Sequence, residues 1–112
     1  MLRIYHNPHC SKSRACLQLL EQANVTVEVV NYLQQPLSAQ LLRSFIDKLG
    51  LKAMIRDNER IYKELKLALA DEETLISAII AHPQLLQRPI VVFDEQVMIA
   101  RPPEKILELV HG

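Results

Sequence analysis

The sequence predicts an α/β fold built on a mixed four-stranded sheet. Short apolar segments flank a helical pattern at the start of the chain, and two more flank a tight turn near its end. Between these two regions, apolar residues recur at helical spacing. The predicted order is therefore strand, helix, strand, several helices, then strand, strand, helix.

The first three predicted elements form a βαβ unit. We expect residues 2–5 to be a strand, and either Cys10 or Ser11 to cap the helix that follows. Helical spacing of apolar residues continues to about Ala23, and residues 25–30 are β-branched and strand-like. Two strands joined in this way are parallel, and their crossover is nearly always right-handed.

The middle of the chain is predicted to be helical. Ser38 caps a helix that Gly50 ends, and Asp71 opens another helix that ends just before Pro83. Residues 52–69 carry a weaker pattern, which we interpret as short helices.

The last part of the chain carries a hairpin and a helix. Residues 89–93 and 96–100 are apolar and flank a two-residue turn, as the strands of a hairpin do. Pro102 and Pro103 follow directly, and proline is well suited to the first turn of a helix. The sequence therefore predicts that the chain ends in ββα.

Chain length and element order together predict a thioredoxin-like fold. A chain of 112 residues has the usual size of one domain, and its 49% hydrophobic residues can supply a core. The βαβ and ββα halves would share one sheet, with a helical insert at about residues 36–86 between them. We expect a single domain over residues 1–112, and a monomer, because this plan leaves no extended apolar stripe uncovered.

Charge and cysteine content exclude several classes of protein. The 13 Lys and Arg residues balance 13 Asp and Glu residues, which argues against nucleic-acid binding and against binding to acidic membranes. No apolar run reaches the roughly 18 residues of a membrane span, and Arg3 and His6 interrupt any signal peptide. With only two cysteines, the chain is no disulfide scaffold, so we expect a cytoplasmic protein with reduced thiols.

Cys10 is the main candidate for a reactive group. It lies between the first predicted strand and the first predicted helix, where the helix dipole favours a thiolate and free backbone N–H groups can bind an anion. A buried structural cysteine is the alternative, but such a residue belongs in an apolar stretch, whereas Cys10 follows His9 and precedes Ser11 and Lys12. We therefore predict that Cys10 is a nucleophile.

Cys16 is predicted to be a core residue of the same helix. It follows Cys10 by six residues, a helical rise of about 9 Å, whereas the Cα atoms of a disulfide lie within about 7 Å. A Cys-x-x-Cys pair is also missing, because Ser13 occupies its second position. We expect no Cys10–Cys16 disulfide, so a second thiol would have to come from another molecule.

Arg14 and His6 lie near Cys10, and each has two possible roles. Arg14 lies one helical turn after Cys10 and could steady a thiolate or an anion, or it could be an ordinary solvated arginine. His6 could tune the thiol or orient the loop, although a lone histidine is more often simply hydrogen-bonded. No histidine and cysteine pair has zinc-site spacing, so we predict no metal.

Two arginines flank the predicted hairpin. Arg88 precedes one strand and Arg101 follows the other, and these ends of a hairpin lie side by side. Two cations brought together are destabilising unless an anion lies between them, and two guanidinium groups grip a tetrahedral oxyanion well. We predict an oxyanion site here, and a cis peptide bond is plausible at Pro89.

Four segments, taken in order, resemble the glutaredoxin-dependent arsenate reductases of thioredoxin-like fold. They cover the loop around Cys10 and the surroundings of three arginines, and the likeness extends over essentially the whole chain. The matching segments are residues 6–10 with 13–14, 55–56 with 62–65, 82–83 with 86–92, and 101–102. The ordered set is more specific than any one segment.

The resemblance implies roles for particular residues. Cys10 would attack arsenate, Arg56, Arg88 and Arg101 would form the oxyanion clamp, and His6 would help to hold the thiolate. Ser13 and Arg14 would support the same loop. From the sequence alone Arg60 is as good a candidate as Arg56.

The resemblance also implies the reaction and its partners. Arsenate would be reduced to arsenite without a bound cofactor, with glutathione as co-substrate and glutaredoxin as protein partner.

Two features depart from the family pattern. Ser11 and Lys12 follow the cysteine where Gly-Thr is usual, and the sequence stops at Gly112, whereas long members extend further. One alternative is therefore a short member of the family acting as a thiol reductase on another substrate. Another is a partner-binding regulator of the same fold, although redox-sensing regulators usually carry a Cys-x-x-Cys pair.

Overall fold

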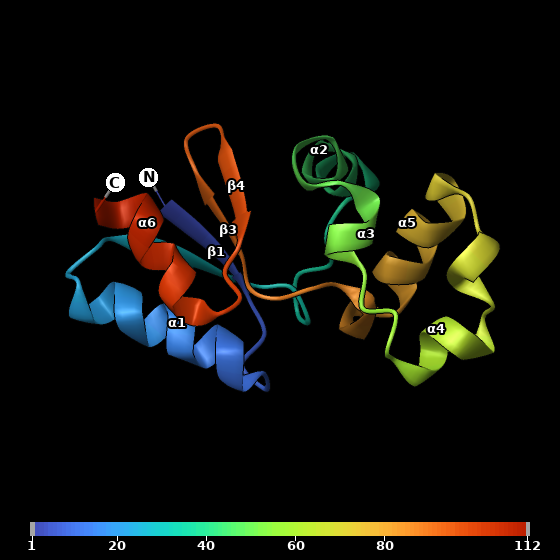
Figure 1. Ribbon diagram of the computed structural model, residues 1–112, viewed down its shortest axis with the longest axis horizontal. Helices are drawn as coiled ribbons and strands as arrows, with labels where there is room; N and C mark the ends of the chain where they lie inside the picture. The colour runs from blue at the N-terminus through green and yellow to red at the C-terminus, as the bar shows by residue number, and fades with distance from the viewer. Residues whose placement is uncertain (1, 112) are drawn as a thin grey trace. The chain divides into compact units, whose positions relative to one another are not determined.

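The computed structural model describes residues 2–111, and these form two compact units (Figure 1). The sheet unit comprises the chain up to Gln35 and from Arg88 onward, and the helical unit is Pro36–Gln87. The predicted insert, residues 36–86, covers this helical unit except for Gln87. That the whole chain acts as one domain stays a prediction.

The sheet unit contains the mixed four-stranded sheet that the sequence predicts. Its strands are β1 (Leu2–His6), β2 (Val27–Asn31), β3 (Ile90–Phe93) and β4 (Gln96–Ile99). Their order is β2-β1-β3-β4; β1 is parallel to β2 and antiparallel to β3, and β4 is antiparallel to β3. The βαβ and ββα halves therefore meet at the β1–β3 pair, where Tyr5 lies opposite Ile90.

Two helices cover one face of this sheet (Figure 1). These are α1 (Ser11–Gln22) and α6 (Ile106–His111), which follows a 3₁₀ turn at Pro103–Lys105. The helix predicted at Pro102 and Pro103 therefore begins as this tighter turn. The shared core consists of Leu2, Ile4, Cys16, Leu20, Val91, Ala100 and Ile106, none more than 1% exposed. This packing fixes α1, and with it Cys10 at its start, against the sheet.

Strand β2 begins two residues later than predicted. The backbone N–H of Val25 donates to the Leu20 carbonyl at 3.1 Å and closes the end of α1. Asn24 reverses the chain there in a left-handed conformation, at φ 56°. Because the Val25 N–H is bonded to the helix end, it does not pair with β1, and the strand starts at Val27.

The helical unit has the predicted helix starts. Its helices are α2 (Ala39–Leu49), α3 (Leu51–Met54), α4 (Arg60–Glu64) and α5 (Glu72–Ala81), with 3₁₀ turns at Leu67–Leu69 and Pro83–Leu85. The Ser38 hydroxyl accepts the Leu41 N–H at 3.1 Å, and the Asp71 carboxylate accepts the Thr74 N–H at 2.8 Å. Gly50 ends α2 at φ +84°, a conformation that L side chains rarely adopt.

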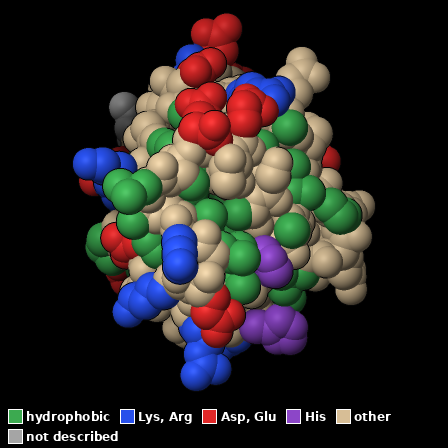
Figure 2. Space-filling model, turned by 90° about the vertical axis from the view of Figure 1, so that its right-hand side faces the viewer, with side chains coloured by type: hydrophobic (Ala, Val, Ile, Leu, Met, Phe, Trp, Pro, Cys, Tyr) green, Lys and Arg blue, Asp and Glu red, His purple; other side chains and the backbone are tan. Residues whose placement is uncertain are grey.

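The surface of the helical unit mixes apolar and charged side chains (Figure 2). Its exposed large apolar residues are Leu65, Leu69 and Ile80. Over residues 2–111, no helix is both long enough and apolar enough to cross a membrane.

Candidate functional site

Cys10 is the N-cap residue of α1, one of the two cap positions that the sequence allowed. Its carbonyl accepts the Arg14 N–H at 3.0 Å, which is the first bond of the helix, and its own N–H donates to the Asn7 carbonyl at 3.1 Å. The residue is 8% exposed. The thiol therefore lies at the positive end of a 12-residue helix, with its backbone held on both sides.

The Cys10 thiol is easier to ionise than an ordinary cysteine. Burial alone raises its pKa, because a charged sulfur is poorly solvated there. The backbone N–H of Ser13, the Arg88 guanidinium and the backbone N–H of Lys12 all donate hydrogen bonds to the sulfur, and the Arg88 charge attracts the thiolate. Together these groups outweigh burial, so that the pKa of Cys10 is lowered. This is the environment of a nucleophilic thiol.

A buried hydroxyl holds the loop before Cys10. Ser13 is fully buried, and its Oγ accepts the Asn7 N–H at 3.1 Å and lies 2.7 Å from His6 Nδ1. The hydroxyl can accept from Asn7 and still exchange a hydrogen bond with His6 Nδ1, as donor or as acceptor according to the tautomer of the ring. Ser13 thus joins the end of β1 to the first turn of α1.

His6 contacts this hydroxyl and is itself buried, at 8% exposed. Burial and, secondarily, the charge of Arg14 lower the pKa of His6, so its ring is neutral at neutral pH. Its hydrogen bond to Ser13 favours the loop-orienting role among the two that the sequence allowed. Direct support of the thiolate by His6 stays a prediction.

Arg14 and Asn7 close the loop through backbone contacts. Arg14 is exposed, and its Nη1 donates to the Pro8 carbonyl at 2.8 Å. The Asn7 side chain accepts the His9 N–H at 2.9 Å. Asn7 is only 6% exposed and has a structural role that the sequence reasoning missed. The signal was present, because Asn followed by Pro is typical of a turn that the Asn side chain stabilises.

The hairpin places Arg88 at the thiol. Its guanidinium is hydrogen-bonded to Cys10, and the Arg88 carbonyl accepts a bond of 3.2 Å from Arg101 Nη1. The Arg88–Pro89 peptide bond, for which a cis form was plausible from the sequence, is cis. The Arg101–Pro102 bond is also cis, which the sequence reasoning did not foresee. The structure thus brings Cys10, Arg88 and Arg101 together within the sheet unit.

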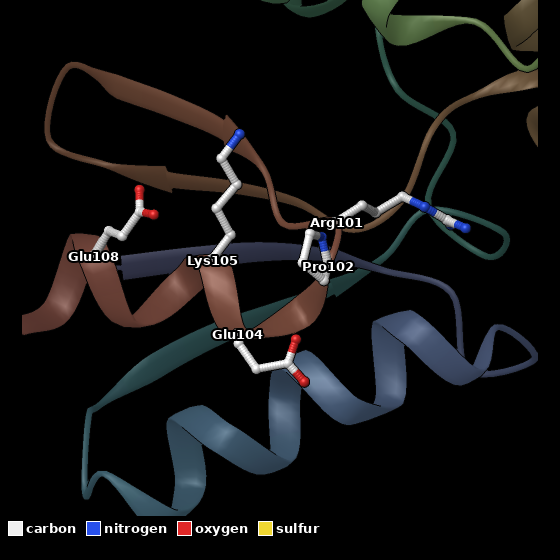
Figure 3. Close-up of a pocket in the computed structure, with 5 residues that line it drawn as sticks. All are labelled: Arg101, Pro102, Glu104, Lys105 and Glu108. Carbon is white, nitrogen blue, oxygen red and sulfur yellow. The ribbon is translucent and has the colours of Figure 1, made fainter.

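Arg101 also borders an open pocket of about 380 Å³. The remaining lining residues are Pro102, Glu104, Lys105 and Glu108. Figure 3 shows the Arg101 side chain extending away from the side chains of Glu104, Lys105 and Glu108. Arg101 and Lys105 balance the two carboxylates of this lining, so the pocket has no net positive charge to attract an anion.

Arg56 belongs to the helical unit. Its N–H donates to the Leu85 carbonyl at 2.7 Å, and its side chain is 15% exposed. Nη1 lies 3.4 Å from Gln87 Oε1, and Nε lies 3.5 Å from Glu59 Oε2. Arg60, the equal candidate on sequence alone, has a side chain that is 91% exposed and pairs with Glu64 on the surface. Arg56 is therefore much less exposed than Arg60.

Cys16 is a core residue, as predicted. It is fully buried against Leu20, and burial raises its pKa to about 12. Both cysteines are free. A thiol with this pKa is protonated at neutral pH, so Cys16 is a poor candidate for a second reacting thiol.

A low-pKa cysteine at a helix N-terminus, on a sheet of this topology, defines a thioredoxin-like thiol protein. The ArsC family profile matches residues 5–109. The chain therefore belongs to the ArsC family.

Individual relatives support this assignment. YfgD of Escherichia coli K12, described as uncharacterized, is 46% identical over 114 residues, 97% of this chain and 96% of its own length. An arsenate reductase of Neisseria meningitidis is 44% identical over 110 residues, 94% of either chain. The structure of an arsenate reductase from Vibrio cholerae has a TM-score of 0.89 at 42% identity and covers 96% of this chain and 95% of its own.

Proposed function

We propose that this chain is an arsenate reductase that uses Cys10 as its nucleophile, with glutathione and glutaredoxin as the source of electrons. The observation that carries the proposal is the lowered pKa of Cys10, which has the backbone N–H groups of α1 on one side and Arg88 on the other. The relatives named arsenate reductase, at more than 40% identity over nearly the whole chain, support the choice of substrate.

The proposed chemistry begins with attack of the Cys10 thiolate on the arsenic atom. A sulfur–arsenic bond forms, and one arsenate oxygen leaves as water after protonation. Glutathione then supplies the second thiol, since Cys16 is buried and protonated. The two thiols become a disulfide, their two electrons reduce arsenic(V) to arsenite, and glutaredoxin restores the thiols. The two thiols supply both electrons, so the proposed reaction needs no bound cofactor.

The proposed oxyanion clamp consists of Arg56, Arg88 and Arg101. Arg88 is supported by its bond to Cys10, and Arg101 by its bond to the Arg88 carbonyl. Arg56 rests on the family resemblance, together with an Nε that has no hydrogen-bond partner among residues 2–111. A planar guanidinium suits this task because it can offer paired donors to a tetrahedral anion.

The test is arsenate-dependent NADPH consumption in a mixture with glutathione, glutaredoxin and glutathione reductase. We expect turnover by the wild type and none by Cys10→Ser, because a serine hydroxyl is not ionised at neutral pH. Turnover that survives in Cys10→Ser would contradict the assignment of the nucleophile. Omitting glutaredoxin from the mixture tests that partner separately.

A second candidate is a thiol reductase of the same site with another substrate. Ser11 and Lys12, in place of the usual Gly-Thr, are exposed beside Cys10 and are the observation that favours it. It predicts no turnover of arsenate, yet rapid alkylation of Cys10 at neutral pH. A partner-binding regulator would need neither a lowered thiol pKa nor affinity for an oxyanion, so the pKa of Cys10 favours an enzyme.

A further inference from the structure

The Arg56 side chain is only 15% exposed, but its guanidinium is weakly bonded. Its Nη1 donates a long hydrogen bond of 3.4 Å to Gln87 Oε1. Its Nε has no hydrogen-bond partner within residues 2–111 and lies 3.5 Å from Glu59 Oε2. The exposed pair of Arg43 and Glu73, by contrast, closes to 2.7 Å. A largely buried cation that is held so loosely keeps donors available for another acceptor.

Glu59 is held next to Arg56 by the backbone between them. The Glu59 N–H donates to the Arg56 carbonyl at 3.3 Å, and the Glu59 carbonyl accepts the Tyr62 N–H at 3.1 Å. Glu59 is also the N-cap residue of α4. Its side chain is 28% exposed, so the ion pair is only partly screened by water. The carboxylate is therefore held near Arg56 by contacts within the helical unit.

We propose that Glu59 is an internal counter-ion of Arg56, which an arriving oxyanion must displace. This inference rests on the proposed function, in which Arg56 belongs to the oxyanion clamp. In the absence of substrate, the carboxylate offsets the cost of a largely buried positive charge. When a doubly charged oxyanion binds, the guanidinium exchanges the long contact with Glu59 for shorter, charge-assisted hydrogen bonds. Glu59 thus lowers the affinity for anions and makes weakly charged ones poor competitors.

The test measures binding of arsenate by calorimetry in a Cys10→Ser background, where no sulfur–arsenic bond can form. Glu59→Gln should bind arsenate about three- to tenfold more tightly, because a competing charge is removed while the shape of the side chain is kept. Glu64→Gln is the matched control. It removes the same charge from the same unit at an exposed pair, so it should leave arsenate affinity unchanged.

Two further variants separate the possible outcomes. Arg56→Ala should weaken arsenate binding, and in that background Glu59→Gln should no longer tighten it. Unchanged arsenate affinity in Arg56→Ala would overturn the clamp role of Arg56, and the inference with it. Weaker binding in Arg56→Ala, with no gain in Glu59→Gln, would overturn only the role of Glu59. If Glu59→Gln does not fold, Glu59→Ala provides the same test, and a loss of affinity in that variant would make Glu59 a positioning residue rather than a competitor.

Discussion

The Cys10 thiol is buried, and burial by itself opposes its ionisation. Its pKa is nevertheless lowered, because the N–H groups of Ser13 and Lys12 and the Arg88 guanidinium favour the thiolate more than burial disfavours it. Two of these three groups belong to the helix start and the third to the hairpin. The lowered pKa of Cys10 therefore depends on a contact between residues far apart in the sequence.

Replacing Arg88 should raise the pKa of Cys10. In Arg88→Ala the hydrogen bond and the attraction to the thiolate are both lost, while burial still opposes ionisation. The rate of alkylation by iodoacetamide, followed against pH, reports this pKa. We expect the wild-type midpoint to lie below that of an ordinary cysteine thiol, and the midpoint of Arg88→Ala to be higher than that of the wild type.

Arg3→Ala is the control for this measurement. It removes an equal charge from an exposed ion pair of the same unit, between Arg3 and Glu28. An equal rise of the midpoint in both variants would mean that net charge, rather than the bond from Arg88, lowers the pKa of Cys10.

Ser13 should be needed for stability as well as for the loop. In Ser13→Ala the buried Asn7 N–H and His6 Nδ1 lose their common partner, which costs about 1 to 3 kcal/mol per unsatisfied group. Urea unfolding would measure the loss. Ser77→Ala, at an exposed position of α5, should change the free energy of unfolding by less than about 0.5 kcal/mol. A loss no larger than that in Ser13→Ala would contradict the role of the hydroxyl.

Helix α1 separates its two cysteines by position. Cys10 is the N-cap residue at its start. Cys16, six residues later, lies on its apolar face and packs in the core. The spacing of apolar residues was enough to predict this division, because a helix turns one face to the core every 3.6 residues. The burial of Ser13 between the two could not be read in this way, since a serine gives no hydrophobic signal.

Cys16→Ala should cost stability without stopping the reaction. The loss of a fully buried sulfur leaves a small cavity, worth about 1 to 2 kcal/mol in the free energy of unfolding. Alkylation of Cys10 and arsenate turnover should be retained, because Cys16 has a pKa of about 12 and faces the core. Turnover abolished in a variant that still folds would instead make Cys16 a reacting thiol.

The hairpin shows what an element contributes to the site. β3 and β4 pair with Ile90 opposite Ile99, which brings the flanking arginines to the same end. That proximity follows from the hairpin alone and was predicted from the sequence. The bond from Arg101 to the Arg88 carbonyl and the second cis proline were not predicted, because both depend on packing around the hairpin end.

At the scale of the whole molecule, the residues proposed for catalysis and for oxyanion binding belong to two different units. Cys10, Arg88 and Arg101 belong to the sheet unit, and Arg56 with Glu59 belongs to the helical unit. Arg88 is the first residue after the helical unit. It belongs to the sheet unit and is hydrogen-bonded to the Cys10 thiol. Binding measurements on the full chain are therefore needed to test the proposed clamp, because its three arginines come from both units.

The sequence by itself determined the strand and helix order, the mixed sheet, the core position of Cys16 and the place of Cys10 at the start of a helix. These features follow from local signals: periodicity, caps, turns and the place of a polar cysteine before a helix. The tertiary structure decided which side chains meet. Contacts between distant segments decide the Arg88 bond to Cys10, the burial of Ser13 and the difference in exposure between Arg56 and Arg60. The sequence does not distinguish an exposed arginine from one that packs against a distant segment.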